Sequence, residues 1–222
     1  MRPLIILHGA WLQPAHYDEV AARLRSDGVT VTVPDLAGQS LTDSTRRVQD
    51  LVDQAVESPV VLAHSFGGVT ATGLKGVSHL LYLSSFVFDV GENAQQWIAR
   101  IEEETGQQGA PLPLTVDDAG MTRLDPAGAR EGLFADCAAQ VADRAIDLLR
   151  PEPVSIFADS PAHAAWKDTP TTYIAASEDR AILPEMVTHF TKRCDTAVTL
   201  PGGHCPFLSR PADVVAIIRN HL

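Results

Sequence analysis

Short apolar runs alternate with amphipathic segments along most of this chain. The runs are rich in Leu, Ile and Val and end at small or turn-forming residues; they cover residues 4–7, 29–33, 60–63, 79–84, 171–175 and 196–200. Continuous apolar runs of this length are typical of strands that are buried on both faces of a parallel sheet. The pattern therefore predicts six strands of one mostly parallel sheet.

Segments with apolar residues at helical spacing lie between these runs. They cover residues 17–26, 42–56, 184–194 and 211–222. Asp43 and Ser44 are capping candidates for the second segment, and Pro184 stands at a favourable first helical position in the third. Alternation of strands and helices implies right-handed crossovers and a doubly wound α/β sheet, whose sites lie at the carboxyl ends of the strands.

One long interval interrupts this alternation. About 80 residues separate the fourth run from the fifth, and a loop of that length without structure of its own is improbable. Residues 92–104 and 133–149 carry apolar positions three or four apart, which predicts helices. We expect residues 87–168 to form a helical cap inserted over an α/β core of residues 1–86 and 169–222. The alternative is a set of extra helices packed on the sheet edge.

Length and charge restrict the class of protein. A chain of 222 residues, 45% of them hydrophobic, suffices for one sizeable α/β domain. The net charge of −11 argues against nucleic acid or an anionic membrane as partner but does not identify a substrate; the candidate chemistry below leads us to expect a small-molecule acyl substrate. No apolar run approaches the roughly 20 residues that span a bilayer, and the N-terminal run is too short for a signal peptide. We therefore expect a cytoplasmic protein, of undetermined oligomeric state.

The three cysteines, Cys137, Cys194 and Cys205, are widely spaced and odd in number. This spacing favours free thiols over a disulfide framework or a zinc site. No cluster of His, Asp or Glu has the spacing of metal ligands either. We accordingly expect no metal and no other cofactor.

The third run leads into a serine turn, Ala63-His64-Ser65-Phe66-Gly67. A serine on a sharp turn between a strand and a helix presents its hydroxyl as a nucleophile. Small residues are needed on both sides, because the turn strains the backbone and brings helix and strand close together. The usual pattern is G-x-S-x-G, and Ala63 replaces its first glycine. Such a pattern becomes informative only in its structural context.

A serine hydroxyl needs a base to take its proton and a third group to orient that base. His204 follows the last apolar run, and Asp179 follows the run before it, with the adjacent Glu178 as the nearest rival. The alternatives are a surface-loop histidine and an ordinary acid preceding a helix. The order Ser65, Asp179, His204 is the order found in α/β-hydrolases.

Acyl transfer also needs two preorganised donors for the oxyanion. The backbone N–H of Phe66 directly follows the nucleophile at the start of a predicted helix, where the helix dipole assists. Ala10, in the loop after the first run, offers the second N–H, and Gly9 permits the turn there. We expect His8 to be a structural hydrogen-bonding group, and His64 to point into or under the pocket.

Four segments carry a family resemblance, namely residues 8–11, 34–40, 64–68 and 203–211. They resemble α/β-hydrolases, and most closely the branch of plant methylesterases and hydroxynitrile lyases with their bacterial relatives. The segments extend over nearly the whole chain in the right order, and only the expected cap is unmatched. The resemblance implies a sheet that begins at the family's third strand, a triad of Ser65, Asp179 and His204, and oxyanion donors at Ala10 and Phe66.

The resemblance also bears on the reaction. Hydroxynitrile lyases of this branch that use a lysine place it directly after the catalytic histidine, where this chain has Cys205. They also carry a threonine near the position of Gly9 and Ala10. Both differences favour hydrolysis: Ser65 attacks an acyl carbonyl, and water then releases the acyl-serine, with His204 as base and then acid.

The substrate pocket is expected between the cap and the strand ends. Its expected lining is aromatic: Trp11, Phe66, Phe86, Trp97, Phe134 and Trp166. For each of the cap residues, packing in the core is an equally good interpretation. A small or medium apolar carboxylic ester is the expected substrate. One alternative is cleavage of a thioester, a lactone, a carbon–carbon bond or a cyanohydrin. The other is ligand binding without catalysis.

Overall fold

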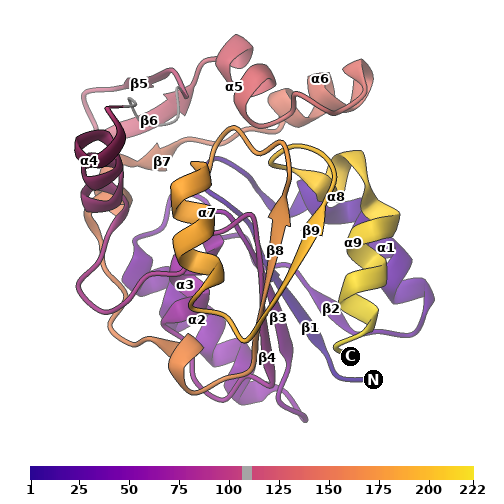
Figure 1. Cartoon of the computed structure of the whole chain (residues 1–222). Helices are drawn as coiled ribbons and strands as arrows, with labels where there is room; N and C mark the ends of the chain where they lie inside the picture. The colour runs from indigo at the N-terminus through magenta and orange to yellow at the C-terminus, as the bar shows by residue number, and fades with distance from the viewer. Residues whose placement is uncertain (107–111) are drawn as a thin grey trace.

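A six-stranded parallel sheet forms the centre of the molecule, in the order β2-β1-β3-β4-β8-β9 (Figure 1). The computed structural model describes residues 1–106 and 112–222. The strands are β1 (Leu4–Leu7), β2 (Val31–Thr32), β3 (Val60–His64), β4 (His79–Leu83), β8 (Thr171–Ala176) and β9 (Thr196–Leu200). The six predicted strands are confirmed. β2 is shorter than predicted, because the N–H of Val29 bonds back to Leu24 and Pro34 has no N–H to give.

Helices cover both faces of this sheet (Figure 1). They are α1 (Asp18–Ser26), α2 (Leu41–Gln54), α3 (Gly67–Thr72), α7 (Pro184–Thr191), α8 (Pro206–Ser209) and α9 (Pro211–Arg219). Leu4 and Ile6 of β1 pack into one apolar cluster with α1 and α9, whereas Ile5 and Leu7 pack into the other with α2 and α3. This alternation is the strand period of two, applied to a sheet that is buried on both sides.

The start of α2 differs from the prediction. Ser40 caps this helix, because its hydroxyl accepts the N–H of Asp43 at 3.1 Å. Asp43 and Ser44 therefore lie inside the first turn and are not the cap. In the part of the chain that the structure describes, no helix is both long and apolar enough to cross a bilayer.

The long interval between β4 and β8 contains both helices and strands. Its elements are α4 (Ala94–Thr105), β5 (Leu114–Val116), β6 (Met121–Leu124), α5 (Pro126–Gly132), α6 (Ala139–Asp147) and β7 (Glu152–Pro153). Figure 1 shows them gathered over the end of the sheet toward which β8 points. β5, β6 and β7 form an antiparallel sheet, which the sequence pattern did not predict alongside the helices of this interval. We propose that residues 87–168 act as a cap, and use that name for them.

The helix expected over residues 92–104 is confirmed as α4, but the one expected over 133–149 is not continuous. Residues 133–138 form turns between α5 and α6. These turns bury Leu133 and Phe134, which are 3% and 1% exposed. They also bring Asp136 against the loop before His204, where a Cβ on Gly203 would lie 2.7 Å from Asp136 Oδ1. The interruption thus lets the cap contact a loop of the core.

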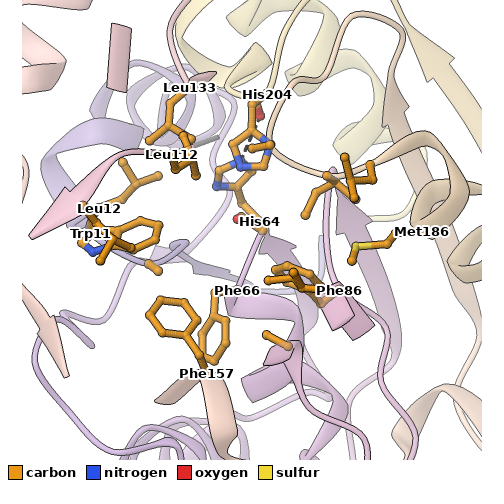
Figure 2. A pocket seen from close by; sticks show the side chains of 18 of the residues that line it. Trp11, Leu12, His64, Phe66, Phe86, Leu112, Leu133, Phe157, Met186 and His204 are labelled. Carbon is orange, nitrogen blue, oxygen red and sulfur yellow. Dashed lines mark hydrogen bonds between the residues drawn. The ribbon is translucent and has the colours of Figure 1, made fainter. Parts of the chain in front are cut away.

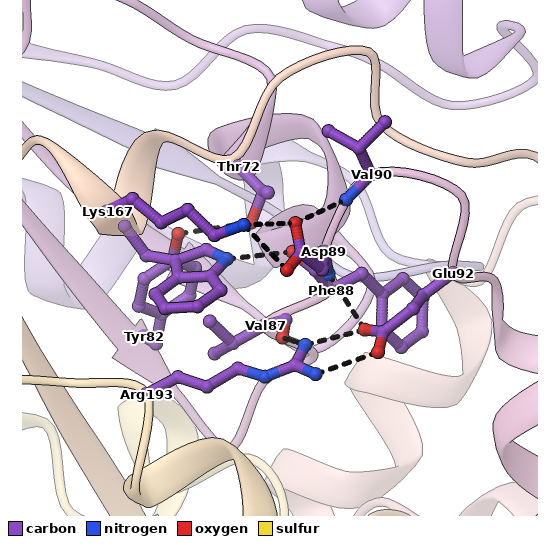
Figure 3. Close-up of polar contacts among 10 residues, drawn as sticks. Thr72, Tyr82, Val87, Phe88, Asp89, Val90, Glu92, Lys167 and Arg193 are labelled. Carbon is purple, nitrogen blue, oxygen red and sulfur yellow. Dashed lines mark hydrogen bonds and ion pairs between the residues drawn. The ribbon is translucent and has the colours of Figure 1, made fainter.

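A polar cluster joins the two ends of the cap to each other, and the first of them to the core (Figure 3). Arg193, which follows α7, donates through Nη1 and Nη2 to Glu92 at 2.5 and 2.7 Å, and through Nη1 to the carbonyl of Val87 at 2.6 Å. Lys167, near the end of the cap, donates to both oxygens of Asp89 at 2.7 Å. Burial acts to raise the pKa of Glu92, but the Arg193 hydrogen bonds and the Asp89 N–H outweigh it and lower that pKa to about 2.

Candidate active site

Ser65 lies at the corner between β3 and α3 in a strained backbone conformation, with φ of 52°. A residue with a side chain keeps such a conformation only where its surroundings impose it. Here the N–H of Ser65 donates to Leu83 at 3.2 Å, and its carbonyl accepts the hydroxyl of Ser85 at 2.7 Å. A Cβ on Gly67 would lie 2.7 Å from two backbone carbonyl oxygens at the end of β1. The tight turn predicted from the sequence is thereby confirmed.

His204 and Asp179 form a buried pair beside this corner. Nδ1 of His204 lies 3.0 Å from both carboxylate oxygens of Asp179, and the two side chains are 2% and 3% exposed. Oδ1 of Asp179 also accepts the N–H groups of Ala181 and Ile182, at 2.8 and 3.1 Å. Burial acts to raise the pKa of Asp179, but His204 and these donors outweigh burial and lower it. The rival acid, Glu178, is exposed.

Ser65 and His204 line the same cavity. In the described part of the chain, no hydrogen bond joins Ser65 Oγ to His204. Because Nδ1 of His204 is paired with Asp179, Nε2 is the ring nitrogen left for the cavity. Bonds between a nucleophile and its base are often long before a substrate binds. The structure therefore brings the three sequence-predicted side chains to one place and leaves the imidazole oriented by Asp179.

His64 supports this arrangement from below. Its Nε2 donates to the carbonyl of His204 at 2.9 Å, so its Nδ1 accepts the hydroxyl of Tyr17 at 2.9 Å. The ring lies 4.6 Å from that of His204 between centroids. Burial, followed by the charge of His204, lowers the pKa of His64 well below its ordinary value. His64 is thus a neutral group with both nitrogens engaged, in agreement with the position expected for it under the pocket.

The loop after β1 lies directly against the serine turn. A Cβ on Gly9 would lie 2.8 Å from the Cβ of Ser65. His8 donates from Nδ1 to the carbonyl of Gly9 and accepts the N–H of Leu36 at Nε2, both at 2.9 Å. Burial lowers the pKa of His8, so this ring is the structural hydrogen-bonding group that the sequence suggests.

The two expected oxyanion donors lie in this neighbourhood. Ala10 and Phe66 both line the cavity that holds Ser65. Neither backbone N–H donates to another residue within the described ranges. Phe66 is the residue before α3, where the first N–H groups of a helix have no partner inside it. Both N–H groups are therefore free to bind an oxyanion.

The cavity has a volume of about 490 Å³ and a mostly apolar wall (Figure 2). Trp11, Phe66 and Phe86 line it as expected. Trp97 and Phe134 do not; they are 3% and 1% exposed and belong to the packed interior. Trp166 also lies outside this cavity, and its indole N–H donates to the carbonyl of Phe88 at 2.9 Å. For these three cap residues, packing away from the cavity, which the sequence left open as an equally good interpretation, is the one that the structure supports.

Other apolar residues complete the wall. Those not identified from the sequence include Leu12, Ile98, Leu112, Leu133, Phe157 and Met186. Phe157 lies in a short 3₁₀ helix after β7, where no periodic pattern marks it. Its ring lies 5.5 Å from both Trp11 and Phe66 between centroids, so it joins cap to core across the pocket. Gln95 and Glu102 of α4 contribute the polar side chains on the cap side.

Metal-ligand groups do not gather at this site. Within residues 1–106 and 112–222, no group of three or more His, Cys, Asp or Glu side chains could hold a metal ion. Cys137, Cys194 and Cys205 are free thiols.

Known proteins resemble this chain over nearly its full length. A sequence model described as the alpha/beta hydrolase family matches residues 4–217. The alpha/beta hydrolase nvfD of Aspergillus novofumigatus is 29% identical, with 98% of this chain and 95% of that protein aligned. A pyrethroid hydrolase of Sphingobium wenxiniae is 26% identical over 98% of this chain and 86% of its own length. The crystal structure of polyneuridine aldehyde esterase shares the fold, with a TM-score of 0.83 at 19% identity over 99% of both chains. These proteins match the resemblance identified in the sequence.

Proposed function

The chain belongs to the alpha/beta hydrolase family, and from that premise we propose that it hydrolyses apolar carboxylic esters through an acyl-serine intermediate. One observation carries the proposal: His204, held by Asp179 at 3.0 Å, lies on the same cavity as Ser65 and the unbonded N–H groups of Ala10 and Phe66. A nucleophile, an oriented base and two oxyanion donors are the parts that acyl transfer requires. The relatives named as hydrolases and the esterase of the same fold support it.

The first half-reaction acylates Ser65. Nε2 of His204 takes the hydroxyl proton as Oγ attacks the ester carbonyl, and Asp179 stabilises the imidazolium that results. The negative oxygen of the tetrahedral intermediate accepts the N–H groups of Ala10 and Phe66. His204 then returns the proton to the alcohol as it leaves. In the second half-reaction water takes the place of the alcohol, and the same residues release the acid.

The cavity supports an uncharged, largely apolar substrate. Its wall is mostly aliphatic and aromatic, and its volume of about 490 Å³ suits a small or medium ligand. Glu102 of α4 and the net charge of −11 disfavour anionic substrates. An ester with an apolar acyl or alcohol part fits these conditions better than the thioester of a negatively charged acyl carrier.

Cyanohydrin cleavage is less well supported. The residue after His204 is Cys205, whose side chain is fully buried. Burial raises the pKa of this thiol well above its ordinary value, so it is neutral and cannot stabilise a leaving cyanide as an ammonium group would. If purified protein released cyanide from a cyanohydrin, and Ser65→Ala abolished that release, the lyase would replace the esterase as the conclusion.

A panel of p-nitrophenyl esters of rising acyl length tests the proposed function. We expect turnover that is highest for apolar acyl groups and falls by at least about ten-thousand-fold in Ser65→Ala. Lactones and thioesters in the same panel define the range of bonds cleaved. Absence of ester turnover in the folded protein, or turnover that survives Ser65→Ala, would contradict the proposal.

A further inference from the structure

Glu152 is a buried carboxylate of the cap that contacts a loop of the core. It lies in β7, pairs with Thr122 of β6 and is 3% exposed. Its Oε2 accepts the backbone N–H of Gly38, at 3.0 Å, from the loop that follows β2. A buried carboxylate in a short cap strand has no part in the acyl transfer described above, so its position calls for another role.

Hydrogen bonds connect the same strand to the residue that follows Ala10. The indole N–H of Trp11 donates to the hydroxyl of Thr122 at 2.9 Å, and that hydroxyl donates to the carbonyl of Glu152 at 2.8 Å. The N–H of Arg150 donates to the carbonyl of Trp11 at 2.8 Å. Trp11 itself has φ of 62°, a left-handed conformation that a bulky residue keeps only under external constraint. Thr122 of β6 and Arg150, just before β7, are the cap residues that hold Trp11 by hydrogen bonds.

The carboxylate lies behind the loop that carries Ala10. A small cavity of about 30 Å³ is lined by Glu152, His8 and Gly9 together with Ala10 and Phe66. Ala10 and Phe66 also line the large cavity that holds Ser65. The two expected oxyanion donors thus form the partition between the two cavities, with Ser65 on one side and Glu152 on the other.

We propose that Glu152 is a positioning residue of the oxyanion hole. Its carboxylate holds the backbone from Gly9 to Trp11 so that the N–H of Ala10 faces the large cavity. The inference rests on the proposed acyl transfer, because only that chemistry needs a fixed donor at Ala10. It acts through the loop and touches no substrate atom.

The charge of this carboxylate changes near neutral pH. Burial raises the pKa of Glu152 to about 7, against the hydrogen bonds from the N–H groups of Gly38 and Trp11. Arg150 acts to lower this pKa and Asp35 acts to raise it, while His8 is kept neutral by its own burial. An ionised carboxylate accepts hydrogen bonds more strongly than a neutral acid. The loop is therefore held more firmly as the pH rises through this range.

Nuclear magnetic resonance of the whole chain tests this link without any substrate. We expect the Ala10 amide and the Trp11 indole resonance, assigned with Trp11→Phe, to shift with a midpoint near about pH 7. Glu152→Gln keeps the size of the side chain but cannot ionise, so this shift should vanish. Glu131→Gln removes an exposed cap carboxylate and should leave it in place. Signals that do not titrate in the wild type, or that titrate equally in Glu152→Gln, would overturn the positioning role.

The pH dependence of ester turnover is the second readout. Because the ionised carboxylate of Glu152 holds the loop, its protonation should add a step of about tenfold to the fall of log kcat/KM on the acid side, centred near about pH 7. In Glu152→Gln this step should be absent, and kcat should be about tenfold lower with KM little changed. Thr122→Val should lower kcat while it keeps this step.

The two readouts separate the two claims. A missing resonance shift overturns the positioning role whether or not esters are cleaved. An acid limb and kcat that Glu152→Gln leaves unchanged overturn it as well. A protein that shows the resonance shift but cleaves no ester keeps the link from Glu152 to Ala10 and loses the proposed esterase activity.

Discussion

Asp179 and Glu152 are both carboxylates that are almost absent from the surface, yet their pKa values shift in opposite directions. Asp179 lies in the core at the end of β8, where His204 and two backbone N–H groups more than offset burial. Glu152 lies in the cap, where burial exceeds its two backbone N–H donors and Asp35 adds repulsion. The hydrogen bond and electrostatic attraction between Asp179 and His204 account for the difference. The core therefore offers a site that is charged at all ordinary pH values, and the cap offers one that responds to pH.

The two carboxylates also differ in what holds them. Asp179 and His204 follow adjacent parallel strands in register, Ala176 beside Leu200, so the sheet itself sets their separation. Glu152 belongs to a strand of two residues in a small antiparallel sheet. The position of the cap depends instead on contacts such as the pair of Arg193 and Glu92 at its base. The proposed acyl transfer thus lies on the regular core sheet, and the proposed pH response lies in the inserted region.

Replacing the core carboxylate should have the largest effect. Asp179→Asn keeps the shape but presents an N–H to Nδ1 of His204 and favours the wrong tautomer, so kcat should fall about ten-thousand-fold, or about 5 kcal/mol. Glu178→Gln, at the exposed neighbour, should stay near wild type. Steady-state kinetics on one ester decides between them. If Glu178→Gln were the variant that lost turnover, the assignment of the acid would be wrong.

Replacing the cap carboxylate should stabilise the fold while it slows the enzyme. Because the folded-state pKa of Glu152, about 7, exceeds the ordinary value of 4.5, its favourable contribution is complete below about pH 4.5. That contribution is lost as the pH rises through about 7. At about pH 8, the free energy of unfolding of Glu152→Gln should therefore exceed that of wild type by up to about 3 kcal/mol. At about pH 4.5 this difference in stability should disappear.

Urea denaturation at the two pH values measures this gain. Glu131→Gln is the matched control and should change the free energy of unfolding by less than about 0.5 kcal/mol. A loss of stability in Glu152→Gln at the higher pH would mean that the carboxylate serves the fold and not the oxyanion loop.

Loosening the base of the cap should have a smaller effect. Arg193→Met leaves the half-buried Glu92 without its cation and should cost about 2 kcal/mol of unfolding free energy. Lys192→Met removes the exposed neighbouring charge and should cost little. The pKa of Glu92 is lowered to about 2, so the pair stabilises the protein fully above about pH 4.5. This stabilisation is lost as the pH falls from about 4.5 to about 2. Equal denaturation curves for the two variants at neutral pH would contradict this role.

Trimming the cap side of the cavity should have the smallest effect. Ile98 of α4 lines the cavity, so Ile98→Ala should shift kcat/KM between short and long acyl esters by about threefold to tenfold, near 1 kcal/mol. Val90→Ala removes a similar side chain from an exposed cap position outside the cavity and serves as control. An identical acyl-length profile in both variants would show that α4 does not select the substrate.

Much of the core could be predicted from the sequence, because its signals are local. Apolar runs marked the six strands, and the turn residues after three of them marked Ser65, Asp179 and His204. The pairing of His204 with Asp179 then follows from the alignment of parallel strand ends. Glu178 could be separated from Asp179 only by the fold, since the direction of a side chain in a loop leaves no trace in the pattern of residues.

The cap could not be predicted to the same depth. β5 has three exposed residues and β7 only two residues in all, so neither shows an alternating pattern. The turn after α5 contains no proline or glycine to mark it, because contacts of Phe134 and Asp136 with the core determine it. Glu152, between two prolines, resembles a surface residue. Its proposed role depends on contact with a loop more than 100 positions away in the chain, that of Gly38.

The central claim is that Ser65 is the acyl nucleophile, and covalent labelling of the folded protein tests it most directly. Incubation with a fluorophosphonate, followed by intact mass and peptide mapping, should give a single adduct on Ser65 that a competing ester delays and Ser65→Ala abolishes. Folded protein that stays unlabelled, or that carries the adduct on another residue, would contradict the account.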